Sequence, residues 1–273
     1  MTTMERLAGL LETIGPMAIA VSGGVDSMAL AALAHRRLGP EKVLAVHAVS
    51  AAVPAAATAR VETWATREGW TLRLIDAGEM ADPAYRANPV DRCFFCKGHL
   101  YGAIARLTDR QVLSGANGDD LAEYRPGLAA ARDHGVRHPY LEAGFDKAMV
   151  RALARDLGLD GLAELPASPC LSSRVETAIE IEPEMLLAID AVERRLTEHL
   201  VARRLAPGTV RCRVRRNGIF IELDPASLDL VQGSGEREIA AAVAALLPPR
   251  LAARGIRFAS YRNGSAFVGV PAG

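Results

Sequence analysis

Residues 22–27 of the chain are S-G-G-V-D-S, and they constrain its fold more than any other stretch. Before them, residues 17–21 form a short apolar run that is typical of a strand covered on both faces. After them, residues 28–38 are strong helix formers with apolar side chains at helical spacing. A glycine pair between a strand and a helix lets backbone N–H groups approach a ligand at the helix N-terminus, where the helix dipole favours an anion. The pattern therefore predicts a phosphate-binding loop.

This loop differs from the Walker type. A Walker loop carries a lysine beside its Ser/Thr, whereas Val25 and Asp26 occupy that place here. An aspartate inside an anion-binding loop makes sense if it holds a metal ion or a network of donors. The stretch resembles the PP-loop of the ATP pyrophosphatase superfamily, whose members split ATP into AMP and pyrophosphate to adenylate a substrate. The alternative is a Ser/Gly turn that caps an ordinary helix.

Composition limits the class of protein. The chain has 273 residues, of which 50% are hydrophobic and 23% charged, enough for a sizeable core in one large domain or two smaller ones. Its 32 basic and 32 acidic residues give a net charge of zero, so a large nucleic acid is not an expected partner. No apolar run is long enough to span a bilayer, and the N-terminal residues are unlike a secretory signal. We therefore expect a cytoplasmic protein with no membrane partner.

Two regions differ in their pattern of strands and helices. Residues 1–177 alternate, with strands expected at 17–21, 42–49, 71–75 and 111–114 and helices at 28–38, 58–68, 100–107 and 147–157. Repeated βα units predict a doubly wound parallel sheet with helices on both faces and ligands at the carboxyl ends of the strands. Residues 178–273 predict a smaller C-terminal α+β domain, with helices at 183–204 and 236–253 and strands at 209–216, 219–223 and 256–261.

A second polar segment follows the fourth expected strand. Residues 115–120 are G-A-N-G-D-D, in which Asn117, Asp119 and Asp120 offer the hard oxygen ligands that Mg²⁺ prefers. By itself this pattern describes a solvated turn equally well. Because both polar segments follow strands of one parallel sheet, the pair favours a magnesium site beside the phosphate loop.

Three cysteines form a further candidate site. Residues 88–97 are N-P-V-D-R-C-F-F-C-K, and residues 168–174 are S-P-C-L-S-S-R. Cys93, Cys96 and Cys170 give three thiolates, one short of a closed all-cysteine zinc site, and suit a 4Fe-4S cluster with one open iron. The alternative is a structural zinc or redox pair at Cys93 and Cys96, with Cys170 buried and inert. Cys212 is expected to be a buried structural cysteine.

Together with Y-R-P-G at residues 124–127, these motifs resemble the LarE family, over about residues 15 to 225. LarE proteins are ATP-dependent sulfur transferases that help to build the nickel-pincer nucleotide cofactor of lactate racemase. The resemblance implies a PP-loop ATP pyrophosphatase fold of the adenine nucleotide alpha hydrolase type. It also implies that a carboxylate of a pyridinium dicarboxylate mononucleotide, a small-molecule nucleotide, is adenylated and then converted to a thiocarboxylate. Family members assemble as homo-oligomers.

The resemblance also implies roles for particular residues. Cys170 is either the sulfur donor itself or, with Cys93 and Cys96, a ligand of a 4Fe-4S cluster that delivers sulfide. Catalysis is assigned to Cys170, Asp26 and Arg174. ATP and Mg²⁺ are assigned to Ser22, Gly23, Gly24, Asp26, Ser27, Asn117, Asp120, Arg125 and Arg213. Glu193 and the row Arg211, Arg213 and Arg215 can face the substrate's carboxylates and phosphate, the alternative being a solvated strand face.

Three other functions remain open at the level of sequence. A tRNA thiolation enzyme also combines a PP-loop with a three-cysteine cluster, and it should carry a basic face or an added RNA-binding module. An ammonia-dependent PP-loop amidating ligase has no need of three thiolates. A non-enzymatic nucleotide sensor or iron-sulfur binding module would release no pyrophosphate when a carboxylate substrate is added.

Overall fold

A computed structural model of the protein describes residues 2–122, 124–166, 168–267 and 269. The chain divides into two compact units. Of the described residues, the first contains 2–82 and 91–168, and the second contains 83–90 and 169–269.

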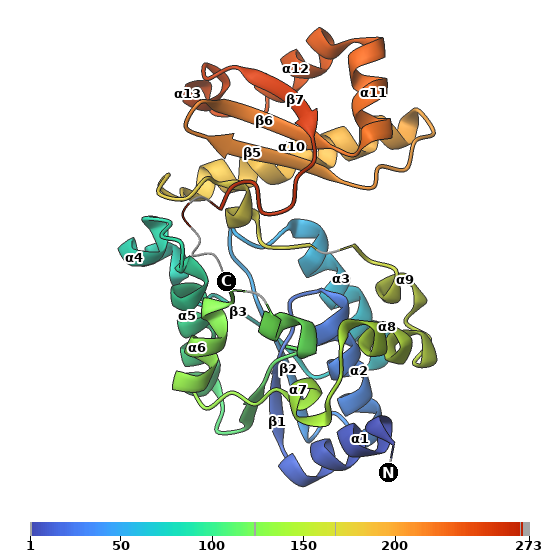
Figure 1. Ribbon diagram of the computed structural model, residues 1–273. Coiled ribbons are helices and arrows are strands. Elements are labelled where there is room, and N and C mark those ends of the chain that lie inside the picture. Colours follow the sequence, from blue (N-terminus) through green and yellow to red (C-terminus); the bar gives the residue numbers. More distant parts are fainter. Residues whose placement is uncertain (1, 123, 167, 268, 270–273) are drawn as a thin grey trace. The chain divides into compact units, whose positions relative to one another are not determined.

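The first unit is built on a four-stranded parallel sheet. Its strands are β1 (Met17–Ala20), β2 (Val43–Ala48), β3 (Leu72–Ile75) and β4 (Gln111–Leu113), in the order β3-β2-β1-β4 (Figure 1). Every neighbouring pair is parallel, with Met17 of β1 opposite Val43 of β2 and Gln111 of β4. The expected α/β fold is therefore confirmed, and β1 lies inside the sheet, where its apolar run is covered on both faces.

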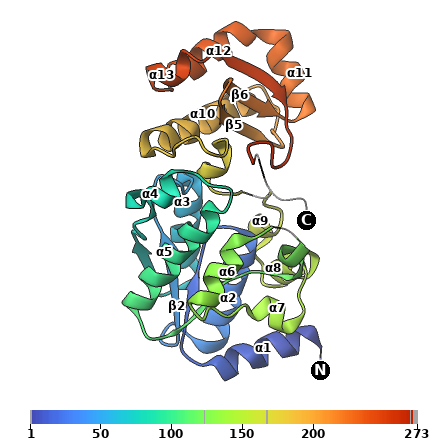
Figure 2. The same cartoon turned by 60° about the vertical axis from the view of Figure 1, so that its left-hand side comes forward.

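Helices cover both faces of this sheet. Met17 and Ile19 of β1 belong to a core that also contains buried side chains of α1 (Thr3–Ile14), α2 (Val25–Leu38), α3 (Ala55–Glu68) and α8 (Lys147–Asp156). Ala18 and Ala20 face the opposite way, into a core shared with α5 (Arg92–Leu107) and α6 (Pro126–Asp133), which lie side by side (Figures 1 and 2). Alternate residues of one strand thus serve two cores, because successive side chains of a strand point to opposite faces.

Shorter helices connect these elements. They are η1 (Glu79–Ala81), η2 (Gly118–Ala122), α7 (Pro139–Ala143) and α9 (Asp160–Ala163). The helix expected at 100–107 begins earlier, at Arg92, so the C-x-x-C motif lies on the first turns of α5 and not in a loop before it. No described helix has both the length and the apolar character that a membrane span needs.

The second unit contains a small mixed sheet. Its strands β5 (Val210–Arg215), β6 (Gly218–Leu223) and β7 (Ile256–Ser260) are ordered β5-β6-β7, with β5 antiparallel and β7 parallel to β6. Its helices are α4 (Pro83–Arg86), η3 (Leu171–Arg174), α10 (Pro183–Ala202), α11 (Pro225–Ser234), α12 (Glu236–Ala244) and α13 (Pro249–Ala252). Arg215 pairs with Gly218 across the β5–β6 turn, so Arg216 and Asn217 are the two turn residues and Gly218 begins β6.

One helix prediction is wrong, and one helix has no prediction. The helix expected at 236–253 is two helices, α12 and α13, because Pro248 and Pro249 cannot donate the backbone hydrogen bonds that a continuous helix requires. Helix α11 was not expected. Its signals are present in the sequence, since the Asp224 carboxylate accepts a hydrogen bond from the Ser227 N–H at the N-cap and Pro225 occupies the first turn.

Asn88 explains why residues 83–90 fold with the second unit. Its side chain is fully buried and donates to the carbonyls of Glu176 (2.9 Å) and Ile179 (3.0 Å). Its own carbonyl accepts a hydrogen bond from the Ala178 N–H at 2.9 Å. Asn88 has a φ of 53°, a conformation that asparagine tolerates better than most residues. The segment just before the C-x-x-C motif is thus fixed to the segment just after Arg174.

Candidate active site

The phosphate-binding loop leaves the carboxyl end of β1 and enters α2. Gly24 is the N-cap of α2, so the first N–H groups of this helix have no partner inside the helix. Gly23 has a φ of +79°, and a Cβ at this position would lie 2.8 Å from the Ala57 carbonyl oxygen of α3. Glycine is therefore required at position 23 both by the backbone conformation and by the approach of α3.

Two serines form hydrogen bonds across this loop. The Ser22 N–H donates to Ser27 Oγ at 3.0 Å, and the Ser27 hydroxyl donates to the Gly24 carbonyl at 3.2 Å. The two hydroxyl oxygens are 3.2 Å apart. Because the Ser27 proton is directed to Gly24, the Ser22 hydroxyl is the donor between them. The conformation of the loop is thus fixed by its own side chains.

The segment expected to hold magnesium lies against the phosphate loop. It follows β4, the parallel neighbour of β1. A Cβ at Gly115 would lie 2.8 Å from the Ser27 amide nitrogen, so the close approach of the two segments requires glycine there. The Asn117 side-chain amide donates to Asp26 Oδ1 at 3.1 Å, which joins the two predicted motifs. The Asn117 N–H in turn donates to Asp120 Oδ2 at 3.0 Å, and Arg125 pairs with Asp120 Oδ1 at 2.8 Å.

Lys147, which sequence reasoning missed, completes this site. Its Nζ lies 2.5 Å from Asp26 Oδ2, at the first residue of α8. The segment before α8 is held by the Gly118 N–H, which donates to the Phe145 carbonyl at 2.8 Å. No sequence signal distinguishes Lys147 from an ordinary residue following the N-cap Asp146, because only the fold brings α8 to the loop. Asp26 thus receives one donor from each of two other segments.

A buried tyrosine forms a hydrogen bond with the backbone of the same aspartate. The Tyr140 hydroxyl donates to the Asp26 main-chain carbonyl at 3.2 Å, and the Tyr140 side chain is fully buried. Burial, and secondarily the charge of Asp26, raises the pKa of Tyr140 well above its ordinary value. Tyr140 therefore remains a neutral donor across the physiological range.

The C-x-x-C cysteines lie on α5 in the first unit. Cys93 and Cys96 are three residues apart on the first turns of the helix, which places them on one face, and both are half-buried. None of the four cysteines, all of which are described, forms a disulfide. The helix N-terminus favours negative charge, which suits thiolates. Among the residues that the structure describes, no three His, Cys, Asp or Glu side chains are grouped so as to hold a metal ion.

Cys170 belongs to the second unit, where Arg174 contacts the backbone around it. The Arg174 guanidinium donates to the carbonyls of Pro169 at 2.7 Å and Cys170 at 3.1 Å. It also forms two bonds of 3.0 Å with the carboxylate of Glu193 on α10. Burial alone would lower the pKa of Arg174, but the Glu193 carboxylate raises it above its ordinary value. Arg174 thus stays positively charged and fixes the backbone at Cys170 through these hydrogen bonds.

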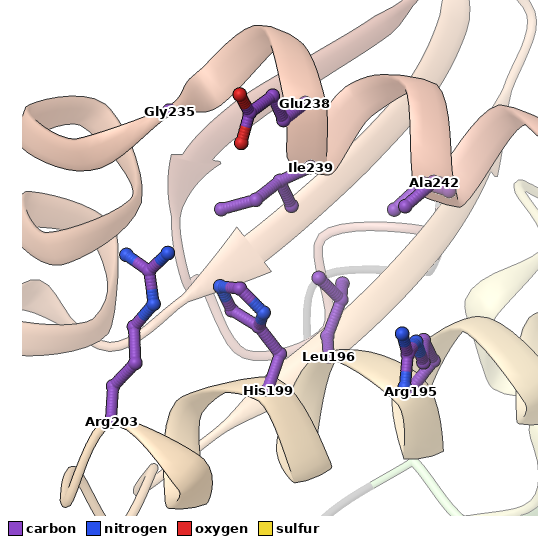
Figure 3. A pocket seen from close by; sticks show the side chains of 9 residues that line it. Arg195, Leu196, His199, Arg203, Gly235, Glu238, Ile239 and Ala242 are labelled. Carbon is purple, nitrogen blue, oxygen red and sulfur yellow. The ribbon is translucent and has the colours of Figure 1, made fainter.

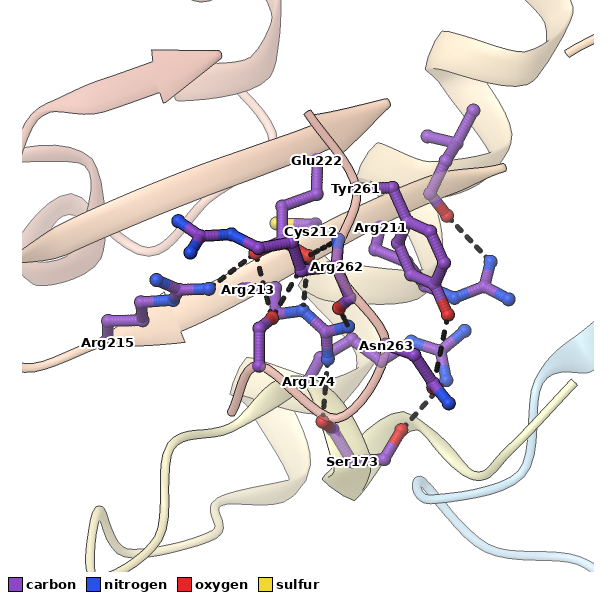
Figure 4. Close-up of polar contacts among 12 residues, drawn as sticks. Ser173, Arg174, Arg211, Cys212, Arg213, Arg215, Glu222, Tyr261, Arg262 and Asn263 are labelled. Atoms are coloured by element: carbon purple, nitrogen blue, oxygen red, sulfur yellow. Dashed lines mark hydrogen bonds and ion pairs between the residues drawn. The ribbon is translucent and has the colours of Figure 1, made fainter. Parts of the chain in front are cut away.

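The arginine row on β5 is not a solvated face. Arg213 is 4% exposed and donates to Glu222 Oε2 (2.8 Å), to the Ser173 carbonyl (3.0 Å) and to the Arg262 carbonyl (3.2 Å) (Figure 4). Arg215 also pairs with Glu222, whose carboxylate is nearly fully buried. Cys212, on the same strand, is fully buried as expected, and burial raises the pKa of its thiol.

One pocket lies apart from all of these residues. It has a volume of about 200 Å³ and opens between α10 and α12 in the second unit (Figure 3). Its walls are Arg195, Leu196, His199, Arg203, Gly235, Glu238, Ile239, Ala242 and Val243. Burial, followed by the charges of Arg203 and Arg195, lowers the pKa of His199. None of the residues predicted from the motifs contributes to this pocket.

The structure therefore brings some of the predicted residues together. Within the first unit, Asp26 and Asn117 are in direct contact, and Asp120 and Arg125 form an ion pair beside them. Within the second unit, Arg174 contacts Cys170 and Glu193, and Arg213 contacts Ser173. Cys93 and Cys96 belong to one unit and Cys170 to the other.

A parallel sheet that carries an S-G-G-V-D-S loop after β1 has the α/β architecture of the PP-loop ATP pyrophosphatase class. No family model matches the chain. An uncharacterised protein of Synechocystis, slr1717, is 37% identical over 226 residues, which are 81% of each chain. Our chain therefore belongs to the same family as this cyanobacterial protein.

Two further relatives extend the comparison. Pyridinium-3,5-bisthiocarboxylic acid mononucleotide synthase of Lactiplantibacillus plantarum is 29% identical over 231 residues, 83% of our chain and 81% of the synthase. An uncharacterised protein of Methanocaldococcus jannaschii, MJ0830, is 28% identical over 141 residues, about half of each chain. The similarity to the synthase supports the LarE family resemblance that the motifs indicate.

Proposed function

We propose that the protein is an ATP-dependent sulfur transferase. It adenylates a carboxylate of a pyridinium dicarboxylate mononucleotide and converts it to a thiocarboxylate, as a step in nickel-pincer cofactor biosynthesis. The observation that carries the proposal is the convergence of Asn117 and Lys147 on Asp26 of the phosphate loop. The similarity to the pyridinium-3,5-bisthiocarboxylic acid mononucleotide synthase supports the choice of substrate.

In the first step, a carboxylate oxygen of the substrate attacks the α-phosphorus of ATP, and the bond to the bridging oxygen breaks. Pyrophosphate leaves with the electron pair of that bond. The N–H groups at the start of α2 and the ammonium of Lys147 stabilise the negative charge on the departing group. The acyl-adenylate that results gives the carboxylate a good leaving group.

Asp26 fits a magnesium site. Mg²⁺ in proteins is usually bound through one or two carboxylates together with substrate phosphates. Asp26 presents such a carboxylate in the first turn of α2, beside the predicted phosphate position, with Asp120 in the adjoining segment. When bound, the ion would neutralise phosphate charge as a Lewis acid. Asn117 holds the Asp26 carboxylate in a fixed orientation for this purpose.

In the second step, sulfur replaces AMP. In the direct route, the Cys170 thiolate attacks the acyl carbon, and AMP leaves with the electron pair of the broken C–O bond. Loss of the Cys170 α-proton to a base, with cleavage of its Cβ–S bond, then releases a thiocarboxylate and leaves dehydroalanine. Arg174 supports this route because it fixes the backbone of Cys170 and places a positive charge near its sulfur.

We propose a second route that uses three cysteines. Cys93 and Cys96, on one face of α5, would be two ligands of a 4Fe-4S cluster, and Cys170 would be the third. Three thiolates suit a 4Fe-4S cluster with one open iron, which would supply a non-core sulfide when bound. Arg92 and Lys97, adjacent in sequence to the pair, would favour the thiolate forms.

The arginines of β5 are proposed to bind the substrate's anionic groups. Arg211 is half-buried, and burial together with the charge of Arg174 lowers its pKa. Glu222 fixes Arg213 and Arg215 in position, so little side-chain entropy is lost when an anion binds. We also propose that the protein forms a homo-oligomer, which light scattering of the purified chain tests.

Cys170→Ser, with Cys212→Ser as the matched control, tests the proposed function. Anaerobically reconstituted protein should contain about four irons per chain, and Cys170→Ser should abolish thiocarboxylate formation while leaving ATP binding intact. Cys212→Ser should retain sulfur transfer per folded molecule, because its thiol is buried. A protein that binds only zinc contradicts the cluster route. Full activity of Cys170→Ser removes Cys170 from the mechanism.

A further inference from the structure

Arg60 of α3 contacts the phosphate loop from outside the predicted motifs. Its Nη1 donates to the Gly23 carbonyl oxygen at 2.9 Å. Burial lowers the pKa of Arg60, and within the described residues no carboxylate forms an ion pair with it. The other two cations of the site have acidic partners, since Lys147 pairs with Asp26 and Arg125 with Asp120. Arg60 thus brings a half-buried positive charge that no described carboxylate pairs with.

The hydrogen bond of Arg60 sets the orientation of one peptide group. The Gly23–Gly24 peptide is planar and trans, so its carbonyl and its N–H point in opposite directions. With the carbonyl turned toward Arg60, the Gly24 N–H is turned into the loop, where Ser22 Oγ lies at 3.4 Å. At 3.4 Å this hydrogen bond is weak, so the Gly24 N–H can donate to a better acceptor instead. Phosphate oxygens are such acceptors.

Charge adds to this geometry. A cation bonded to a carbonyl polarises the peptide, which strengthens the N–H of the same peptide as a donor. The loop also rests on α3 at Ala57, whose carbonyl leaves no room for a Cβ at Gly23. Arg60 and Ala57 are one helical turn apart and therefore act on Gly23 from the same helix face.

We propose that Arg60 is a positioning residue for phosphate, which turns and polarises the Gly23–Gly24 peptide toward the pyrophosphate portion of ATP. The inference rests on the proposed function, since it requires that the loop bind ATP. The Arg60 guanidinium supplies the positive charge that the lysine supplies in a Walker loop. In this proposal the adenosine portion of ATP does not contact the Gly23–Gly24 peptide.

Calorimetric titration of Arg60→Met with inorganic pyrophosphate, ATP and adenosine tests the inference. We expect Kd for pyrophosphate and for ATP to rise about tenfold, as for loss of one charge-assisted hydrogen bond, with Kd for adenosine unchanged. Arg60→Lys should recover most of the affinity, because an ammonium can also donate to the carbonyl. Arg67→Met is the matched control, since Arg67 is on the same helix but exposed and stacked on Trp64 at 4.7 Å.

The outcomes separate this inference from the proposed function. Unchanged pyrophosphate and ATP affinity in Arg60→Met overturns the role of Arg60. An equal loss for adenosine, together with a lower Tm, also overturns it, because Arg60 would then support only the fold. If the wild-type protein binds neither ATP nor pyrophosphate, the proposed function fails and this inference fails with it.

Discussion

Lys147 Nζ lies 2.5 Å from Asp26 Oδ2 and joins the first residue of α8 to the first turn of α2. The two residues are far apart in sequence and meet only because both helices pack on the same face of the sheet. The side chains are partly exposed, so the pair is open to a ligand. An ion pair at the mouth of an anion-binding loop can exchange its carboxylate partner for phosphate, which makes Lys147 a residue for binding charge and not only for stability.

Lys147→Met should lower kcat/KM for ATP-dependent pyrophosphate release by about 100-fold, as for removal of one preorganised electrostatic donor. Lys42→Met, at an exposed lysine before β2, should leave the rate unchanged. Pyrophosphate release under steady-state conditions measures both. Equal rates for Lys147→Met and the wild type would contradict the role of Lys147.

Gly23→Ala should destabilise the protein more than Gly39→Ala. Both glycines have a φ near +79°, but a Cβ at Gly23 would meet the Ala57 carbonyl at 2.8 Å, whereas nothing lies within 4 Å of one at Gly39. Strained backbone costs about 1–3 kcal/mol at each position, and the clash at Gly23 should add at least about 1 kcal/mol. Urea denaturation measures the difference. Equal losses of unfolding free energy in Gly23→Ala and Gly39→Ala would show that α3 moves away from the added Cβ at little cost.

Stability should decrease on mild acidification because of His47. Its buried ring bridges the Val21 carbonyl (2.8 Å) and Thr58 Oγ1 (2.9 Å), and burial lowers the pKa of His47 below 6.5. The unfolded chain therefore binds the proton more readily than the folded one, and the free energy of unfolding rises with pH. The stabilisation is complete above pH 6.5 and is lost as pH falls from there through the lowered pKa.

His47→Asn should flatten this pH dependence. The variant has no titrating ring at position 47, so the fall in unfolding free energy between about pH 6.5 and pH 5 should be smaller, by up to about 1.4 kcal/mol per pH unit. Urea denaturation at several pH values gives the two profiles. Parallel profiles for His47→Asn and the wild type would assign the acid lability to other groups.

Glu193→Gln should lower the free energy of unfolding by about 3 kcal/mol, because it leaves the buried Arg174 without its charged partner. Arg174 is 2% exposed, and Glu193 also accepts the Cys212 N–H at 2.9 Å. Glu198→Gln is the control on the same helix, since its partner Arg195 is 65% exposed, and it should change stability by less than about 0.5 kcal/mol. Similar effects of the two substitutions on thermal or urea unfolding would exclude a special role for the Arg174–Glu193 pair.

Much of the first unit could be predicted from local patterns. The apolar run at β1 and the S-G-G-V-D-S stretch determine strand, turn and helix within one short segment, because glycine geometry and helix-end donors act locally. The same is true of the parallel sheet, whose strands recur with helices between them. The position of Asn117 beside Asp26 also follows, since the carboxyl ends of neighbouring parallel strands meet at one edge.

Other side-chain contacts depend on tertiary packing and cannot be predicted from a local sequence pattern. Lys147 follows an ordinary helix cap, and only the docking of α8 brings it to Asp26. For Arg213 the sequence leaves a ligand-facing and a solvated position open, yet Glu222 and two backbone carbonyls make its burial possible. Arg60 resembles any other arginine on an amphipathic helix until its contact with Gly23 is known.

The most direct test of the central claim is mass analysis of an anaerobic incubation of the wild-type protein with ATP, Mg²⁺ and the pyridinium dicarboxylate mononucleotide. We predict formation of the thiocarboxylate together with AMP and pyrophosphate. The mass of the protein itself reports the sulfur source, since direct donation by Cys170 removes the mass of hydrogen sulfide from the chain. Recovery of unmodified mononucleotide, with ATP intact, would contradict the proposed activity.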